Sequence, residues 1–249
     1  MDLAVNIAPA FITQIPEEKI KAMSWIRDTL TSSIGRKVSM SLTGLFLVSF
    51  LIVHLSGNFL LFKNDSGNAF NLYAHFMSTN PLLRVLEIGL LAGFLIHIGT
   101  AFLLTTKNSA ARPQGYAYSA NSPKVTWFSR NMGLSGSIVL VFLIIHLLNF
   151  YFPYHYGFDQ YVNIEGESYK DMYSLVATVF KNEWWYSILY ILAMFLLSFH
   201  LQHGFASSFQ SLGLEHKKYT PIIEGLGTLI AILIPLGFAT MPLYFLFLN

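Results

Sequence analysis

Residues 133–152 read GLSGSIVLVFLIIHLLNFYF, an apolar stretch with no Asp, Glu, Lys or Arg and with one histidine, His146. An α-helix of this length covers about 30 Å, the thickness of the hydrocarbon core of a bilayer. The stretch is therefore predicted to span a membrane. An ionisable side chain inside the hydrocarbon region is costly and needs a partner within the protein. His146 must find such a partner.

Three other apolar stretches carry a histidine in the same way. They are SLTGLFLVSFLIVHLSGNF (41–59) with His54, LEIGLLAGFLIHIGTAFLL (86–104) with His97, and YILAMFLLSFHLQHGFASSF (190–209) with His200. One buried histidine is commonly a hydrogen-bonded core residue. Four of them, one in each of four helices, are typical of axial ligands that work in pairs. Because two imidazoles on opposite sides of an iron hold a low-spin haem, the pattern predicts two haem b groups.

The composition supports a membrane protein, because 54% of the residues are hydrophobic and only 11% are charged. We expect an all-α integral membrane protein with five transmembrane helices, of which the first four form a bundle around two stacked haems. The fifth helix has no histidine and is expected to serve packing. The predicted spans are 38–62, 81–104, 132–152, 184–205 and 222–247.

Charge and cysteine content exclude several other classes. The chain has no cysteine, which excludes disulfides, covalent c-type haem attachment and an iron–sulfur cluster of its own. A net charge of +2 is too small to indicate nucleic acid binding.

The N-terminal region differs from the rest of the chain. Residues 15–30, IPEEKIKAMSWIRDTL, are predicted to form a short amphipathic helix that either enters the membrane interface or packs on a soluble partner. The expected division is a cytoplasmic N-terminal segment, 1–35, followed by the membrane domain, 36–249.

Lysine and arginine are distributed unevenly between the two sides of the predicted bundle. The N-terminal region and the segments 107–130 and 211–220 hold 11 of the 15, and the opposite side holds the other four. Positive charges favour the cytoplasmic side. The N-terminus is therefore expected in the cytoplasm and the C-terminus outside.

Depth pairs the histidines. Each one lies 16 residues after a helix start, taken as Val38, Pro81, Arg130 and Trp184. Because successive helices run in opposite directions, His54 and His146 fall in the outer half and His97 and His200 in the inner half. The two irons would then lie about 10–15 Å apart along the membrane normal. His203, three residues after His200, competes with it for the inner site and is expected to be a hydrogen-bonding neighbour instead.

Glycines recur with the histidines. Gly44 and Gly136 each lie ten residues before a histidine, in TGLFLVSFLIVHL and SGSIVLVFLIIHL. Ten residues correspond to about 15 Å of helix, which brings both glycines to the level of the inner pair. A bare backbone there would let a porphyrin edge approach, although small residues also serve ordinary helix packing in lipid. Haem propionates need cations or hydroxyl donors, for which the inner side offers Arg36, Ser41 and Arg130.

Several motifs are similar to those of a known family. They are His54 followed by Asn58, the stretch AFNLYAHFMSTNPLLRVLEI (69–88), the segment Gly136–His146, and SFHLQHG (198–204). Over residues 36–215 the chain resembles the di-haem cytochrome b membrane anchor of succinate dehydrogenases and fumarate reductases, in its single-polypeptide five-helix form.

This resemblance implies haem ligands at His54, His97, His146 and His200. It implies docking, on the cytoplasmic side, to an iron–sulfur subunit that in turn carries a flavoprotein, where succinate and fumarate are interconverted. It also implies a quinone site near the outer haem, with menaquinone or a related quinone, and a location in the bacterial cytoplasmic membrane. Candidate quinone groups at the outer ends of the first two helices are Asn58, Lys63, His75 and Glu87. Glu87 is also spaced for an ordinary ion pair with Arg84.

Two alternatives remain open at this point. One is the cytochrome b subunit of a formate dehydrogenase or hydrogenase, which would be expected to distribute its histidines differently. The other is a haem-free transporter whose histidines relay protons.

The charge asymmetry makes a prediction about topology. A reporter fused after Asn249 is expected outside the cytoplasm, and a reporter inserted in the segment 107–130 is expected inside it. Alkaline phosphatase and fluorescent-protein fusions would measure both positions. A cytoplasmic C-terminus would invert the depth assigned to each histidine pair.

Overall fold

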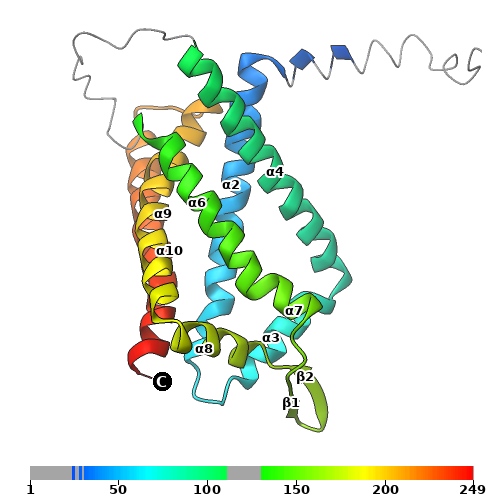
Figure 1. Ribbon diagram of the computed structural model, residues 1–249. Helices are drawn as coiled ribbons and strands as arrows, with labels where there is room; N and C mark the ends of the chain where they lie inside the picture. The colour runs from blue at the N-terminus through cyan, green and yellow to red at the C-terminus, as the bar shows by residue number, and fades with distance from the viewer. Residues whose placement is uncertain (1–23, 26–27, 30, 111–129, 249) are drawn as a thin grey trace, which may run out of the picture.

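The computed structural model describes residues 24–25, 28–29, 31–110 and 130–248 (Figure 1). Within these ranges five helical segments are long and apolar enough to cross a membrane. They are α2 (Ser33–Asn58) continued by η1 (Phe59–Phe62), α4 (Pro81–Ala110), α6 (Met132–His146) continued by η2 (Leu147–Tyr151) and α7 (Phe152–Tyr156), α9 (Trp184–Ser211), and α10 (Thr220–Phe247). The prediction of an all-α membrane protein with five spanning helices is confirmed. The amphipathic helix expected at 15–30 lies almost wholly outside the described residues.

The helices begin at residues that suit a helix start. Ser32 caps α2, since its hydroxyl accepts from the amide of Gly35 at 2.9 Å. Pro81 is the first residue of α4, where proline loses no helical hydrogen bond. The side chain of Asn80 accepts from the amide of Leu82 at 3.0 Å. These capping residues fix the positions at which α2 and α4 begin.

The two ends of the bundle differ. At one end, which we call the capped end, lie the short helices α3 (Asn68–Thr79) and α8 (Met172–Asn182) and a hairpin of β1 (Tyr161–Ile164) and β2 (Glu167–Lys170) (Figure 1). At the other end, the open end, lie the start of α2, the end of α4 and the start of α6 (Figure 1). His54 and His146 are nearer the capped end, and His97 and His200 are nearer the open end.

The region 154–183, which leads into α9, is folded. Its hairpin turns through Glu165 and Gly166, which have φ angles of 54° and 91°. Two consecutive positive φ angles are typical of the type I′ turns that join adjacent antiparallel strands. An Asn-Gly or Asp-Gly pair would have been the usual signal for this turn, and Glu-Gly is a weaker one.

A buried polar network fastens the cap. Asn71 on α3 is 1% exposed and donates to Asp171 at 2.9 Å, while its carbonyl oxygen accepts from the amide of Tyr173 at 2.8 Å. Asp171 in turn caps α8 by accepting from the amide of Ser174 at 3.1 Å. One asparagine therefore joins α3 to the start of α8, about 100 residues later in the chain.

The helices pack unequally. The most extensive contact joins α9 and α10, and α2 lies against α4, α9 and α10. By contrast, no residue of Met132–His146 is buried, and α4 buries only Gly93 and Thr100. Large apolar side chains such as Ile88 and Phe102 are about two-thirds exposed. Such surface is expected where a helix faces lipid.

The Asn71 network makes a prediction about stability. Asn71→Ala removes the hydrogen bonds that Asn71 makes with the carboxylate of Asp171 and with the amide of Tyr173, and is expected to cost about 1–3 kcal/mol. Thermal unfolding in detergent and limited proteolysis of the segment 157–171 would measure the change. Asn182→Ala, the same substitution at an exposed position on α8, is the matched control. Equal behaviour of the two variants would contradict a fastening role for Asn71.

Candidate functional site: two histidine pairs in the bundle

The first histidine pair lies in the half of the bundle nearer the capped end. His54 of α2 faces His146, the last residue of α6, with ring centroids 5.9 Å apart and ring planes at 87°. Aromatic rings surround both imidazoles. Phe50 stacks on His54 at 5.2 Å, and Phe150 lies 5.2 Å from His146.

The second pair lies in the half nearer the open end. His97 of α4 faces His200 of α9, with ring centroids 6.4 Å apart and ring planes at 70°. The structure thus brings together the same partners that helix direction and depth pair in the sequence. Among the described residues, the ring that contacts His97 in this pair is that of His200, and His203 makes no such ring contact with His97.

The two recurrent glycines lie at the second pair. A Cβ atom placed on Gly44 would come within 3.5 Å of the imidazole of His97, and one placed on Gly136 within 3.3 Å of that of His200. The level agrees with the ten-residue spacing. Both glycines lie against imidazole rings of this pair, and room for a porphyrin edge stays a prediction.

The ring nitrogens are satisfied unequally. His97 Nδ1 lies 3.3 Å from the hydroxyl of Thr43, and His54 Nδ1 lies 3.4 Å from the amide nitrogen of Asn58. The Nδ1 atoms of His146 and His200 are buried and have no hydrogen-bond partner among the described residues. A buried polar atom without a partner is costly. One histidine of each pair therefore lacks a partner that the chain itself supplies.

The spacing of the rings fits a metal ion held between two imidazoles. An imidazole nitrogen binds a metal at about 2 Å and lies about 1 Å from its ring centroid, so two opposed ligands have centroids about 6 Å apart. The observed 5.9 and 6.4 Å are close to this value. In the part of the chain that is described, no three His, Asp or Glu side chains form a metal cluster. Each pair offers two ligands, as suits an iron whose other ligands come from a porphyrin.

The residues considered for haem propionates lie at the open end. Ser41 is 2% exposed, and its hydroxyl donates to the carbonyl of Lys37 at 2.9 Å. The guanidinium of Arg36 donates to the carbonyl of Thr31. Arg130 is exposed just before α6. Arg36 and Arg130 are cations near this end, while the hydroxyl proton of Ser41 is already used within its own helix.

The four candidate quinone groups all lie toward the capped end, but each has partners of its own. Asn58 donates to the carbonyl of His54 at 2.8 Å, and Lys63 pairs with Asp65 at 3.4 Å. The ring of His75 packs against that of Tyr169. The contacts therefore do not gather these groups into one pocket.

Glu87 has the richest surroundings of the four. It accepts from Arg84 at 2.5 Å, which is the ion pair that the spacing allowed, and from the hydroxyl of Tyr151 at 2.5 Å. Tyr151 and His155 have no signal in the sequence, because Tyr151 reaches Glu87 and His155 reaches Arg84 only through the packing of η2 and α7 beside α4.

Two further residues near the site, Thr43 and Tyr73, are not among the sequence-based candidates. Thr43 does have a signal in the sequence, since it precedes Gly44 in the repeat just as Ser135 precedes Gly136. The ring of Tyr73, on α3, lies within 2.5 Å of a Cβ placed on Gly57, next to Asn58. Burial raises the pKa of Tyr73 above its usual value, so its hydroxyl keeps its proton at neutral pH.

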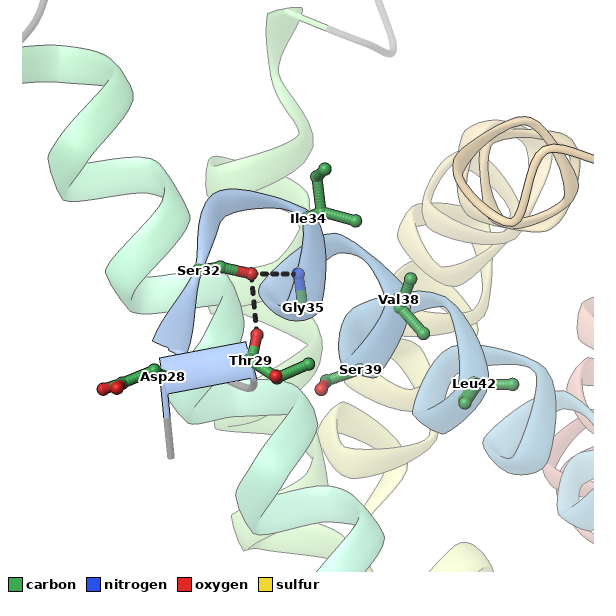
Figure 2. A pocket seen from close by; sticks show the side chains of 8 residues that line it. All are labelled: Asp28, Thr29, Ser32, Ile34, Gly35, Val38, Ser39 and Leu42. Atoms are coloured by element: carbon green, nitrogen blue, oxygen red, sulfur yellow. Dashed lines mark hydrogen bonds between the residues drawn. The ribbon is translucent and has the colours of Figure 1, made fainter. Parts of the chain in front are cut away.

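A cavity of about 560 Å³ lies at the start of α2 and is separate in its lining from the histidine pairs. Figure 2 shows Ser32 there, with its hydroxyl bonded to the amide of Gly35 and to the carbonyl of Thr29. Apolar side chains of α2 complete the lining, among them Ile34, Val38 and Leu42. None of the described residues that line it is a histidine.

The family described as succinate dehydrogenase/fumarate reductase transmembrane subunit matches residues 105–239, more than half of the chain. The chain belongs to this family. The matched region includes one histidine of each pair, His146 and His200. No curated protein and no solved structure matches the chain.

Family membership has two consequences. The chain is a multi-pass membrane subunit of a succinate dehydrogenase or fumarate reductase complex, which also contains flavoprotein and iron–sulfur subunits. Membership also decides against a formate dehydrogenase or hydrogenase subunit and against a transporter.

Proposed function

We propose that this chain is the membrane anchor and electron-transfer subunit of a succinate:quinone oxidoreductase. It would act in a succinate dehydrogenase or in a quinol:fumarate reductase, and carry electrons between the iron–sulfur subunit and membrane quinone by way of two b haems. The observation that carries the proposal is the pair of facing histidines in each half of the bundle, with ring centroids 5.9 and 6.4 Å apart.

The histidines would supply all four axial ligands. His54 and His146 would hold one haem, and His97 and His200 the other. Each haem iron, when bound, takes up and releases one electron at a time. The Nδ1 contacts with Asn58 and Thr43 orient one imidazole of each pair. Such second contacts fix the ring and tune the basicity of the ligand.

Other residues would shape the inner site. Gly44 and Gly136 leave room beside His97 and His200, where a Cβ would touch the first ring and crowd the second. Arg36, Ser41 and Arg130 remain the candidates for the propionates at the open end, and the two arginines would supply the charge.

The charge distribution supports an orientation. Of the ten Lys and Arg residues in the described part of the chain, six lie at the open end: Arg36, Lys37, Lys107, Arg130, Lys217 and Lys218. This end would face the cytoplasm of a bacterial cell, and the iron–sulfur and flavoprotein subunits would dock there. Dicarboxylate chemistry would take place in the flavoprotein. The capped end would then face outward.

The quinone would react near the capped end. A second haem in that half is useful only if electrons enter or leave there, and a quinone beside the inner haem would make the outer one redundant. Asn58, Lys63, His75 and Glu87 are the candidate polar groups, and menaquinone is the expected quinone. Because Glu87 makes the closest polar contacts, it is the strongest of the four.

The ligand assignment predicts which variants lose the same haem. Wild-type protein is expected to bind two b haems per chain, measured by pyridine haemochrome. His54→Ala and His146→Ala should each remove the same haem, and His97→Ala and His200→Ala the other. His203→Ala is the matched control and should keep both. One haem per wild-type chain, or loss of the inner haem in His203→Ala but not in His200→Ala, would contradict the assignment.

The glycines give an independent check. Gly136→Val would place methyl groups against the ring of His200, where even a Cβ approaches to 3.3 Å. It is expected to lower occupancy of the inner haem and to leave the outer haem bound, as measured by redox titration of the two spectral components. Gly99→Val is the control, because a Cβ at Gly99 meets no atom within 4 Å.

A further inference from the structure

Four polar side chains form a closed cluster where α4 meets the far end of the α6 segment. They are Arg84 and Glu87 on α4, Tyr151 in η2 and His155 in α7. We propose that Tyr151 is the residue that positions the carboxylate of Glu87, the strongest of the quinone candidates above, for proton exchange with the quinone. The inference rests on the proposed function and adds to it the residues that hold the Glu87 carboxylate in one orientation.

The carboxylate of Glu87 is held at both oxygens. The hydroxyl of Tyr151 donates to Oε1 at 2.5 Å, and Arg84 Nη1 donates to Oε2 at 2.5 Å. A donor at each oxygen fixes the plane of the carboxyl group. Charge-assisted hydrogen bonds of this kind are the strong ones. The side chain of Glu87 is nevertheless 31% exposed, so a ligand can reach it from the lipid side.

The contacts of His155 fix its tautomer and close the cluster. Its Nδ1 lies 2.9 Å from the carbonyl oxygen of Tyr151, which can only accept, so Nδ1 carries the proton. Nε2 is then an acceptor, and it faces Arg84 Nη1 at 3.5 Å. The ring of His155 also stacks on that of Tyr151, with centroids 4.3 Å apart. His155 therefore holds both the ring that reaches Glu87 and the guanidinium beside it.

The backbone aims Tyr151 at α4. Leu147–Tyr151 form a π-helical turn directly after His146. In an α-helix a residue five positions on lies about 140° around the axis, whereas the wider π-turn brings it back toward the face of the first residue. Tyr151 thus lies about 7 Å beyond His146 along the helix. Single π-turns are common at functional sites. This one links a proposed haem ligand to the carboxylate.

The surroundings suit a quinone. Leu148 and Phe152, on either side of Tyr151, are 58% and 46% exposed. A polar cluster beside such apolar surface matches a molecule with a polar ring and an apolar tail that is dissolved in the membrane. The position near the capped end also lies beside the His54–His146 pair, which is the proposed exit or entry of electrons.

The chemistry balances as follows. When a quinol is oxidised, one hydroxyl O–H bond breaks and its proton forms an O–H bond on the Glu87 carboxylate. Glu87 passes that proton to water at the capped end and then accepts the second. The two electrons would leave the quinol one at a time, toward the haem that His54 and His146 would hold. Quinone reduction runs through the same transfers in reverse. Throughout, the Tyr151 hydroxyl keeps the carboxylate in one orientation.

The experiment uses the purified complex with all its subunits. The matched variants are Tyr151→Phe and Tyr161→Phe, the second at a tyrosine that is 56% exposed on β1. The quinone probe is 2,3-dimethyl-1,4-naphthoquinone or its quinol. Tyr151→Phe is expected to lower kcat about tenfold or more while KM stays within about twofold, since the change affects proton transfer more than binding. Tyr161→Phe should behave as wild type.

A second readout separates positioning from general damage. Redox-induced infrared difference spectra should show a carboxyl band that is absent in Glu87→Gln and displaced in Tyr151→Phe. Both variants should keep two b haems by spectrum. Wild-type kcat and an unmoved band in Tyr151→Phe would overturn this inference alone. A wild-type chain that purifies without haem would overturn the proposed function, and this inference with it.

Discussion

An imidazole in the hydrocarbon core must find its partner inside the protein, and this constraint shapes the bundle. Each of the four spanning helices that carries a conspicuous histidine turns it toward a histidine of another helix, His54 toward His146 and His97 toward His200. Since lipid tails are as apolar as leucine, burial of apolar surface does little to bring helices together in a membrane. The polar pairs and the small residues beside them therefore contribute more to helix association here than they would in water.

The sequence predicted the spanning helices and the pairing for simple reasons. Charge-free apolar runs are almost unambiguous at this length, and helix rise converts residue counts into depth. Even Thr43, beside His97, could have been found from its place before the recurrent glycine. The capped end could not be predicted in this way. Its hairpin has only a Glu-Gly turn as a signal, and Asn71 meets Asp171 through contacts about 100 residues apart in the chain.

The Glu87 cluster shows the other limit of sequence reasoning. Spacing on one helix predicted the Arg84–Glu87 pair, because residues three apart share a face. The contact between Tyr151 and Glu87 could not be predicted from residue spacing. The direction of the Tyr151 side chain depends on a π-turn, in which the usual helical period does not apply. A residue count along α6 would have placed Tyr151 on the wrong side. The residues that matter at such a turn become visible only in three dimensions.

The position of α4 connects these observations. This helix buries only Gly93 and Thr100, so most of its surface is free to face lipid. Its contacts with the rest of the bundle include those of His97 with Thr43 and His200, of Gly93 with Phe46, and of Glu87 with Tyr151. Two of these contacts lie at the proposed inner haem site and at the proposed proton-exchange site. Ligand binding at both would then also hold α4 in place, so that assembly of this helix and function of the subunit depend on the same contacts.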